Sequence, residues 1–354
     1  MISLATIAKQ YQNDFQNDYA HCLQTVHYRA LDKIIQCHTP QAGVLLYHCS
    51  PCHIDTTLYP SCGHRHCPAC QHKANNDWLE TQRQKLLPVD YYLVTFTLPC
   101  HLRPFVWHHQ TWAYQAMFQA TKETLMSFFE RDKQLGEQVG LSAVLHTNSR
   151  KLDYHPHIHF VVPGGGLNKS QTLWQKKSGK YLFNAKNLAK VFRGKFIALM
   201  KDAGYYLPSG TPKTWIADCE RVGRGDTALT YLARYLYRGV ISEKNILSLK
   251  NGQVTFRYKD SKTKTFKIIK ESATKFLWRI MQHVLPKGFR RSRNFGFLHG
   301  NAVRTLKRLQ LILKMALPPP VTKLKSLVCC PHCKAEMDLY LMRIGQHLVL
   351  GKTR

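Results

Sequence analysis

Hydrophobic residues near the start of the chain recur at the spacing of an α-helix. Ile7, Tyr11 and Phe15 lie about one turn apart, and a second set follows until Pro40 interrupts the pattern. Because residues at these intervals share one face of a helix, we predict a helical segment from residue 1 to about residue 40.

The middle of the chain instead alternates between strand-like and helix-like stretches. Runs rich in β-branched and aromatic residues predict strands over residues 91–97, 143–147, 157–162, 253–259 and 265–269. The last two are expected to form a hairpin, and a helical pattern covers residues 102–132. This mixture predicts an α+β domain.

Changes in composition divide the chain into three consecutive predicted domains. The first, residues 1–87, joins the helical segment to a cysteine-rich stretch. The α+β domain follows over residues 88–315, and three prolines at 318–320 separate a short appendage over residues 316–354.

The net charge indicates which kind of molecule the protein binds. Lys and Arg number 51 against 21 Asp and Glu, a formal charge of +30, and such a field favours a polyanion such as nucleic acid. A hydrophobic content of 44% excludes wholesale disorder. No apolar run approaches the roughly 20 residues that cross a bilayer, and no signal peptide is evident. We therefore expect a cytoplasmic protein with no membrane partner.

Twelve cysteines in such a chain favour metal binding over disulfides. Two C-x2-C knuckles are separated by fourteen residues: Cys49 with Cys52, and Cys67 with Cys70. Tetrahedral Zn²⁺ takes four thiolates, so these four residues predict a structural zinc site. Cys62, His64 and His66 lie in the same segment, and either one of them replaces a ligand or a second ion binds.

The remaining cysteines carry weaker signals. Four scattered ones are expected to be small buried hydrophobes: Cys22, Cys37, Cys100 and Cys219. In the appendage, Cys330-x2-Cys333 supplies only half a zinc site. One alternative is that the site is completed by Cys329, His332 or His347. The other is that the pair binds no metal.

The first zinc segment has two compatible roles. It is too short to build a hydrophobic core of its own, so a metal would hold it together. Arg65, between His64 and His66, places a cation on its surface, where it can contact DNA phosphates or bases.

Three histidines alternate with other residues at the start of the predicted strand 157–162. In a strand, His155, His157 and His159 share one face, while the hydrophobic residues beyond enter the core. One such histidine is usually only a polar residue, but two or three on one face favour a metal site. Because Pro156 marks the start of the regular strand, His157 and His159 are the safer ligands and His155 is the local candidate for the third.

A second chemical signal lies in a predicted helix between an N-cap at Asp226 and a C-cap at Gly239. Leucines form one stripe, and polar residues lie opposite: Tyr231, Arg234, Tyr235 and Arg238. Such tyrosines either fill a core, stack on bases or act in phosphodiester chemistry. Because leucines already supply the core stripe, we favour chemistry.

Tyrosine attack on phosphate needs help from a cation. A phenol has a pKa near 10, so at neutral pH a histidine-bound divalent ion, Mg²⁺ or Mn²⁺, would have to stabilise charge on the phosphate. The arginines of the same helix would brace the phosphate or lower the pKa of the phenol.

Taken in order, these motifs resemble the HUH-type rolling-circle transposases, specifically the two-tyrosine group of the insertion sequence ninety-one type. The matching segments are residues 61–71, 155–166 and 231–235, with further matches at 95–99, 283–289 and 330–333. The resemblance covers most of the chain.

The resemblance implies an HUH endonuclease-like central antiparallel sheet flanked by helices, preceded by a helical and zinc-binding, DNA-binding N-terminal domain. His157 and His159 would hold the divalent ion, and Tyr231 and Tyr235 would be the nucleophiles. A tyrosine would nick single-stranded DNA at an insertion-sequence end, stay linked to the 5′ phosphate and leave a 3′ hydroxyl for the host replication machinery. The second tyrosine would permit a matching strand transfer to target DNA. The enzyme would be bacterial, cytoplasmic and associated with the nucleoid.

Other interpretations remain open. A plasmid replication initiator or relaxase would use the same chemistry. A noncatalytic zinc-dependent DNA-binding regulator would instead take most of its affinity from the positive charge, through counterion release. Basic residues of the segment 288–307 either line a DNA path or form a solvated face: Arg290, Arg291, Arg293, Arg304 and Lys307. Tyr237 is expected to contact DNA or to pack.

Overall fold

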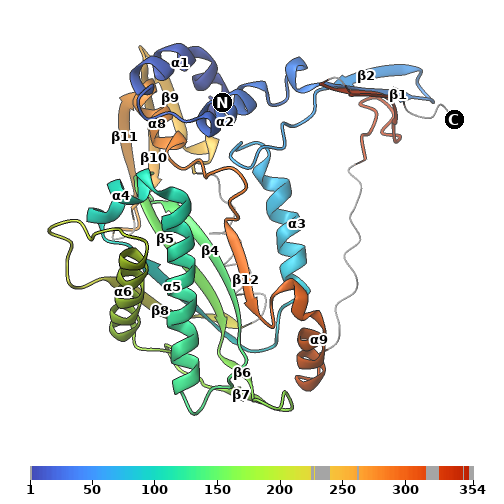
Figure 1. The fold of residues 1–354 in the computed structure, drawn as a ribbon. Coiled ribbons are helices and arrows are strands. Elements are labelled where there is room, and N and C mark those ends of the chain that lie inside the picture. Colours follow the sequence, from blue (N-terminus) through green and yellow to red (C-terminus); the bar gives the residue numbers. More distant parts are fainter. Residues whose placement is uncertain are drawn as a thin grey trace. The chain divides into compact units, whose positions relative to one another are not determined.

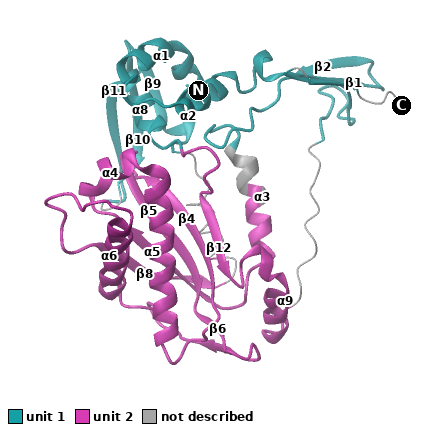
Figure 2. Cartoon of the chain, viewed as in Figure 1, with its two compact units in different colours: residues 1–74, 239–284, 321–354 teal, residues 75–238, 285–320 magenta. Residues whose placement is uncertain are grey.

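The computed structural model describes residues 2–224, 227, 240–260, 263–315, 327–345 and 347–350, apart from the side chains of residues 71–75 and 77 (Figure 1). The chain forms two compact units (Figure 2). Unit 1 comprises residues 1–74, 239–284 and 321–354, and unit 2 comprises residues 75–238 and 285–320. Each unit is therefore assembled from separate stretches, whereas composition predicts three consecutive domains. Among the described helices, none combines the length and the apolar character needed to span a bilayer.

Unit 2 is built on a five-stranded antiparallel sheet in the order β12-β4-β5-β3-β8. Its strands are β3 (Asp90–Thr97), β4 (Gly140–Asn148), β5 (Tyr154–Pro163), β8 (Ile216–Arg224) and β12 (Ser292–Gly296). A small hairpin of β6 (Gly165–Leu167) and β7 (Trp174–Lys176) follows β5. The first three predicted strands lie within β3, β4 and β5, and the α+β class is confirmed.

Two long helices, α5 (Gln110–Arg131) and α6 (Ala185–Asp202), cover one face of this sheet (Figure 1). Alternation along β5 turns Phe160 to that face, where its ring lies 6.1 Å from that of Phe96 on β3. Phe96 in turn lies 5.2 Å from Phe192 of α6. The helix predicted over 102–132 is interrupted at His109, whose backbone is not helical, and so forms α4 (Arg103–His108) and α5.

The opposite face of the sheet has a hydrophobic part and a polar part. Val144 of β4 and Val161 of β5 pack in a second buried cluster with Leu306 and Leu309 of α9 (Val303–Ile312). Helix α3 (Gln71–Arg83) adds partly buried side chains to this cluster. Farther along β4 and β5, the same face continues with histidines.

The described part of unit 1 includes the helices α1 (Leu4–Tyr19), α2 (Thr25–Gln36) and α8 (Ala273–Met281) and a three-stranded sheet in the order β11-β10-β9. The strands are β9 (Ile246–Lys250), β10 (Gln253–Lys259) and β11 (Phe266–Ser272). The predicted helical segment and the predicted hairpin are both confirmed. The hairpin nevertheless belongs with the N-terminal helices, because α8 follows it and packs on α1, with Tyr19 stacked on Trp278 at 5.0 Å.

A second sheet of unit 1 joins the two ends of the chain. Its order is β14-β13-β1-β2, with β1 (Val44–Cys49), β2 (Ile54–Leu58), β13 (Asp338–Ile344) and β14 (His347–Leu350) (Figure 1). Single 3₁₀ turns occur elsewhere at η1 (Pro40–Ala42), η2 (Cys100–Leu102), η3 (Glu243–Asn245) and η4 (Gly300–Ala302). The predicted appendage thus supplies two strands to a sheet that begins near residue 44.

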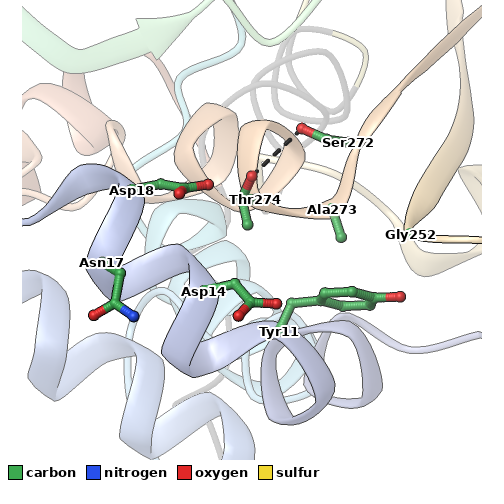
Figure 3. A pocket seen from close by; sticks show the side chains of 8 residues that line it. All are labelled: Tyr11, Asp14, Asn17, Asp18, Gly252, Ser272, Ala273 and Thr274. Atoms are coloured by element: carbon green, nitrogen blue, oxygen red, sulfur yellow. Dashed lines mark hydrogen bonds between the residues drawn. The ribbon is translucent and has the colours of Figure 1, made fainter.

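A pocket in unit 1 lies between α1 and the start of α8 (Figure 3). Asp14 and Asp18 line it from α1, and Ser272 and Thr274 line it from the other side, joined by a hydrogen bond of 3.4 Å. Two carboxylates without a lining cation repel a phosphate backbone, so this pocket does not suit a nucleic acid.

His27 is a buried histidine that holds the start of α2. The backbone N–H of Gln24 donates to its Nδ1 at 2.9 Å, and only 2% of the residue is exposed. Burial lowers the pKa of His27 from 6.5 to about 4. The ring is therefore neutral at pH 7 and can accept this hydrogen bond.

The lowered pKa of His27 predicts an acid-sensitive contribution to stability. As the pH falls, His27 takes up a proton at a higher pH in the unfolded chain than in the folded one. Its contribution to stability is therefore complete above pH 6.5 and is lost as the pH falls to about 4. A shift of this size corresponds to about 3 kcal/mol at most. We expect the unfolding free energy of the wild type to fall by up to that amount relative to H27Q, measured by denaturant titration at pH 4, 5, 6 and 7.

H27Q is the matched control because its amide oxygen still accepts from Gln24 but takes up no proton. Parallel pH dependence of the two proteins across this window would contradict the assignment.

Candidate functional site

Three imidazoles meet on the polar part of the unit 2 sheet. His146 comes from β4, and His157 and His159 come from β5; their potential ligand atoms all lie within 4.8 Å of one another. The antiparallel register pairs His146 with His157, and strand alternation returns His159 to the same face. The alternating sequence of β5 produces this arrangement, because Ile158, between His157 and His159, is buried in the core.

Hydrogen bonds orient the two histidines of β5. The Nδ1–H of His157 donates to the carbonyl oxygen of His155 at 2.7 Å. Nδ1 of His159 lies 2.8 Å from the hydroxyl oxygen of Thr95 on β3. With Nδ1 engaged in this way, Nε2 is the nitrogen of each ring suited to a metal, as is usual for metal-binding histidines.

The electrostatic environment keeps these rings neutral. Burial lowers the pKa of His159 to about 4, and burial together with the adjacent His159 holds the pKa of His157 well below its ordinary value. The neutral imidazole is the form that binds a metal, so protons do not compete for these two residues near pH 7. Three imidazole donors fit a divalent transition ion such as Mn²⁺ better than Mg²⁺, which prefers oxygen ligands.

His155, the predicted third ligand, lies outside this group. Its Nδ1 accepts a hydrogen bond of 2.8 Å from Nη2 of Arg103 at the start of α4. His146 completes the group instead, and the sequence analysis missed it. A signal was present: strands 143–147 and 157–162 are consecutive and separated by a short connection, so a hairpin would bring residue 146 opposite residue 157.

Tyr231 and Tyr235 lie outside the described residues, as do Arg234, Arg238 and Tyr237. The predicted tyrosine helix follows β8 directly in the sequence, and β8 pairs with β3, the strand that carries Thr95.

The predicted DNA-binding arginines of the segment 290–293 differ in their surroundings. Arg290 is exposed. The Nε–H of Arg291 donates to the carbonyl oxygen of Leu145 at 3.0 Å, directly beside His146 in the chain. The guanidinium of Arg293 lies over the ring of Phe118 at 4.2 Å, so it also contributes to packing.

Arg304 and Lys307, also predicted to contact DNA, are exposed in unit 2, and Arg65 lies in unit 1. Arg65 is exposed and sits between two members of the cysteine-rich segment, Cys62 and Cys67.

Eight of the twelve cysteines form two groups of four, and the four predicted zinc ligands are divided between these groups. One group consists of Cys37, Cys62, Cys67 and Cys70; the other consists of Cys49, Cys52, Cys330 and Cys333. The two predicted knuckles therefore do not share one ion, because Cys49 and Cys52 lie with the C-terminal pair. The alternate Cys62 is in the first group, whereas His66 is in neither.

The first cysteine group is assembled where α2 ends. Cys37, expected as a buried hydrophobe, caps this helix, and its Sγ lies 3.5 Å from Sγ of Cys70. The backbone N–H of Cys62 donates to Sγ of Cys37 at 3.5 Å, and Sγ of Cys62 lies 3.5 Å from Sγ of Cys70. Four convergent sulfurs with an amide donor match the donor set of structural zinc.

Comparison with known proteins points to DNA transposition. Residues 7–98 match the family described as "Transposase zinc-binding domain", and residues 140–305 match the family described as "Putative transposase". The chain is 32% identical over 342 residues to "Putative transposase y4qJ" of Sinorhizobium fredii, covering 90% of this chain and 85% of that protein. It is 28% identical over 323 residues to "Transposase for insertion sequence element IS801" of Pseudomonas savastanoi pv. phaseolicola, covering 85% and 78%.

The two candidates for the third ligand can be separated by paired substitutions. We expect H146A to weaken Mn²⁺ binding by about 10-fold or more, because it removes one of three converging donors. H155A should change the affinity by less than about threefold, because the contact that orients His157 uses the backbone carbonyl, which the variant keeps. Isothermal titration of the purified proteins at pH 7 measures both, and the reverse ranking would restore His155 as the ligand.

Proposed function

Because the chain belongs to the transposases of the insertion sequence ninety-one type, we propose that it cuts and joins single-stranded DNA at insertion-sequence ends by tyrosine attack. The observation that supports this mechanism is the convergence of His146, His157 and His159 on one face of the unit 2 sheet. The lowered pKa values of His157 and His159 and the hydrogen bonds that orient these two rings suit a metal centre that acts on a charged backbone.

The proposed chemistry is an exchange of phosphodiester bonds. The phenolic oxygen of Tyr231 or Tyr235 attacks phosphorus, forming a tyrosine–5′-phosphate bond while the bond to the 3′ oxygen breaks. The phenolic proton passes to solvent, and the departing 3′ oxygen takes up a proton. Because one phosphoester replaces another, a 3′ hydroxyl can reverse the step and join strands without an external energy source.

The three histidines would hold the divalent ion, Mg²⁺ or Mn²⁺, that such a centre uses. Bound there, the ion would draw negative charge from the phosphate oxygens. The residues around it have separate tasks: Thr95 and the His155 carbonyl fix the two rings of β5, and Arg291 holds the backbone of β4 beside His146. Arg234 and Arg238 would brace the phosphate from the tyrosine helix.

The second tyrosine gives the enzyme a way to act on two strands. While one tyrosine holds the first 5′ end, the other is available for a matching cleavage in the target DNA. The released 3′ hydroxyl is a primer for a polymerase, so the host replication machinery is the partner that this product requires.

Unit 1 would supply binding to the DNA. The net charge of +30 favours association with DNA by counterion release, and Arg65 presents a cation beside the cysteine group of residues 37–70. Arg290 would add a phosphate contact in unit 2. This affinity for DNA would place the enzyme at the bacterial nucleoid.

The tyrosine mechanism predicts a covalent product. We expect the protein, incubated with Mn²⁺ and labelled single-stranded DNA that carries the element ends, to form an adduct that survives a denaturing gel. Peptide mapping should locate it on Tyr231 or Tyr235. The double variant Y231F/Y235F should lower its yield by about 10³-fold or more, because the phenolic oxygen is the nucleophile.

Y237F is the matched control from the same predicted helix and should keep the adduct. H157A or chelator should abolish it. Tight, metal-independent binding without an adduct on several end sequences would instead indicate a noncatalytic DNA-binding protein.

A further inference from the structure

We propose that the chain carries a second structural zinc site, made by Cys49 and Cys52 together with Cys330 and Cys333, that ties the C-terminal strands to the N-terminal hairpin. The ligand sulfurs of all four lie within 4.8 Å of one another. Sγ of Cys49 lies 3.5 Å from Sγ of Cys333, across 284 residues of sequence. Residues 330 and 333 fall outside the stretch 7–98 that matches the transposase zinc-binding domain.

The two knuckles share one backbone feature. In each, the residue after the second cysteine adopts a left-handed conformation: His53 with φ 52° and Lys334 with φ 62°. Neither residue is glycine, so each turn is strained, and something else in the structure must offset that strain. Two C-x2-C turns of the same form that face each other are the usual way in which a protein presents four thiolates to one ion.

The hydrophobic interior around this site is too small to hold the sheet alone. The buried cluster here contains only Cys49, Cys330 and Met337 among the described residues. Hydrophobic side chains of β14 stay exposed, with Leu348 at 58% and Leu350 at 70%. A sheet with so little apolar burial is the kind of fold that depends on a metal for stability.

Strand pairing explains how the two knuckles meet. Strand β1 ends at Cys49, and its antiparallel partner β13 begins at Asp338, paired with His48. Each knuckle therefore lies at the same end of this pair, one immediately after β1 and one shortly before β13. The backbone N–H of Met337 donates to the carbonyl oxygen of Val328 at 2.8 Å, which closes the second knuckle into a tight loop.

Donor chemistry selects the metal. Four cysteine sulfurs in a compact set favour Zn²⁺ or iron, whereas Mg²⁺ and Ca²⁺ take oxygen ligands. None of the three residues that the sequence offered to complete the C-terminal pair is in the group: Cys329, His332 and His347 lie outside it. Cys329 is exposed and adjoins the buried Cys330, which makes it the matched control.

The test counts metal in the full-length protein. We expect two zinc ions per chain by elemental analysis, one for each cysteine group. C330S/C333S should lower the count to one, and C329S should leave it at two. C62S/C67S should also give one, because it removes the other group.

A second measurement applies to the wild-type protein and does not depend on a folded variant. With zinc bound, Cys330 and Cys333 should resist alkylation, whereas Cys329 should react at once; a chelator should expose the pair together with Cys49 and Cys52. A wild-type count of one zinc, rapid alkylation of the pair in the zinc-loaded protein, or disulfides between the four residues would each overturn the proposal.

Discussion

The alternation of side chains along β5 is the constraint on which both the core of unit 2 and its histidine group depend. Odd positions carry His157 and His159, and even positions carry residues such as Phe160 that lie beneath α5 and α6. A register slip of one residue would turn the imidazoles toward α5 and α6 and would remove Phe160 and its neighbours from the core at the same time. The packing of the core therefore fixes the positions of the two histidines, although the core residues themselves do not belong to the candidate metal site.

Period-two patterns explain why this part of the molecule can be predicted from the sequence. The runs of β-branched and aromatic residues in β3, β4 and β5 predict these strands. The spacing of His157 and His159 is enough to place both rings on one face of the sheet. His146 needed one further step, the pairing of adjacent strands as a hairpin. That step is local enough to infer, since the connection between β4 and β5 is short.

The grouping of the cysteines could not be predicted from their spacing in the sequence. A C-x2-C spacing identifies a knuckle but does not identify its partner, because the partner is chosen by strand pairing over hundreds of residues. Cys49 and Cys52 lie with Cys330 and Cys333 through the pairing of β1 with β13, and Cys37 joins a group that its isolated position does not suggest. The same long-range contacts make unit 1 discontinuous, which composition along the chain does not reveal.

The split construction of unit 1 has a consequence for synthesis on the ribosome. Every described strand of the unit 2 sheet precedes residue 297, and α9 ends at Ile312, so the histidine-bearing sheet can form while residues 338–344 are still inside the exit tunnel. Strand β1 must wait for its partner β13, which emerges after all the described strands of the unit 2 sheet. A nascent chain therefore passes through a stage in which its histidine-bearing sheet is formed while one edge of its N-terminal hairpin is still unpaired.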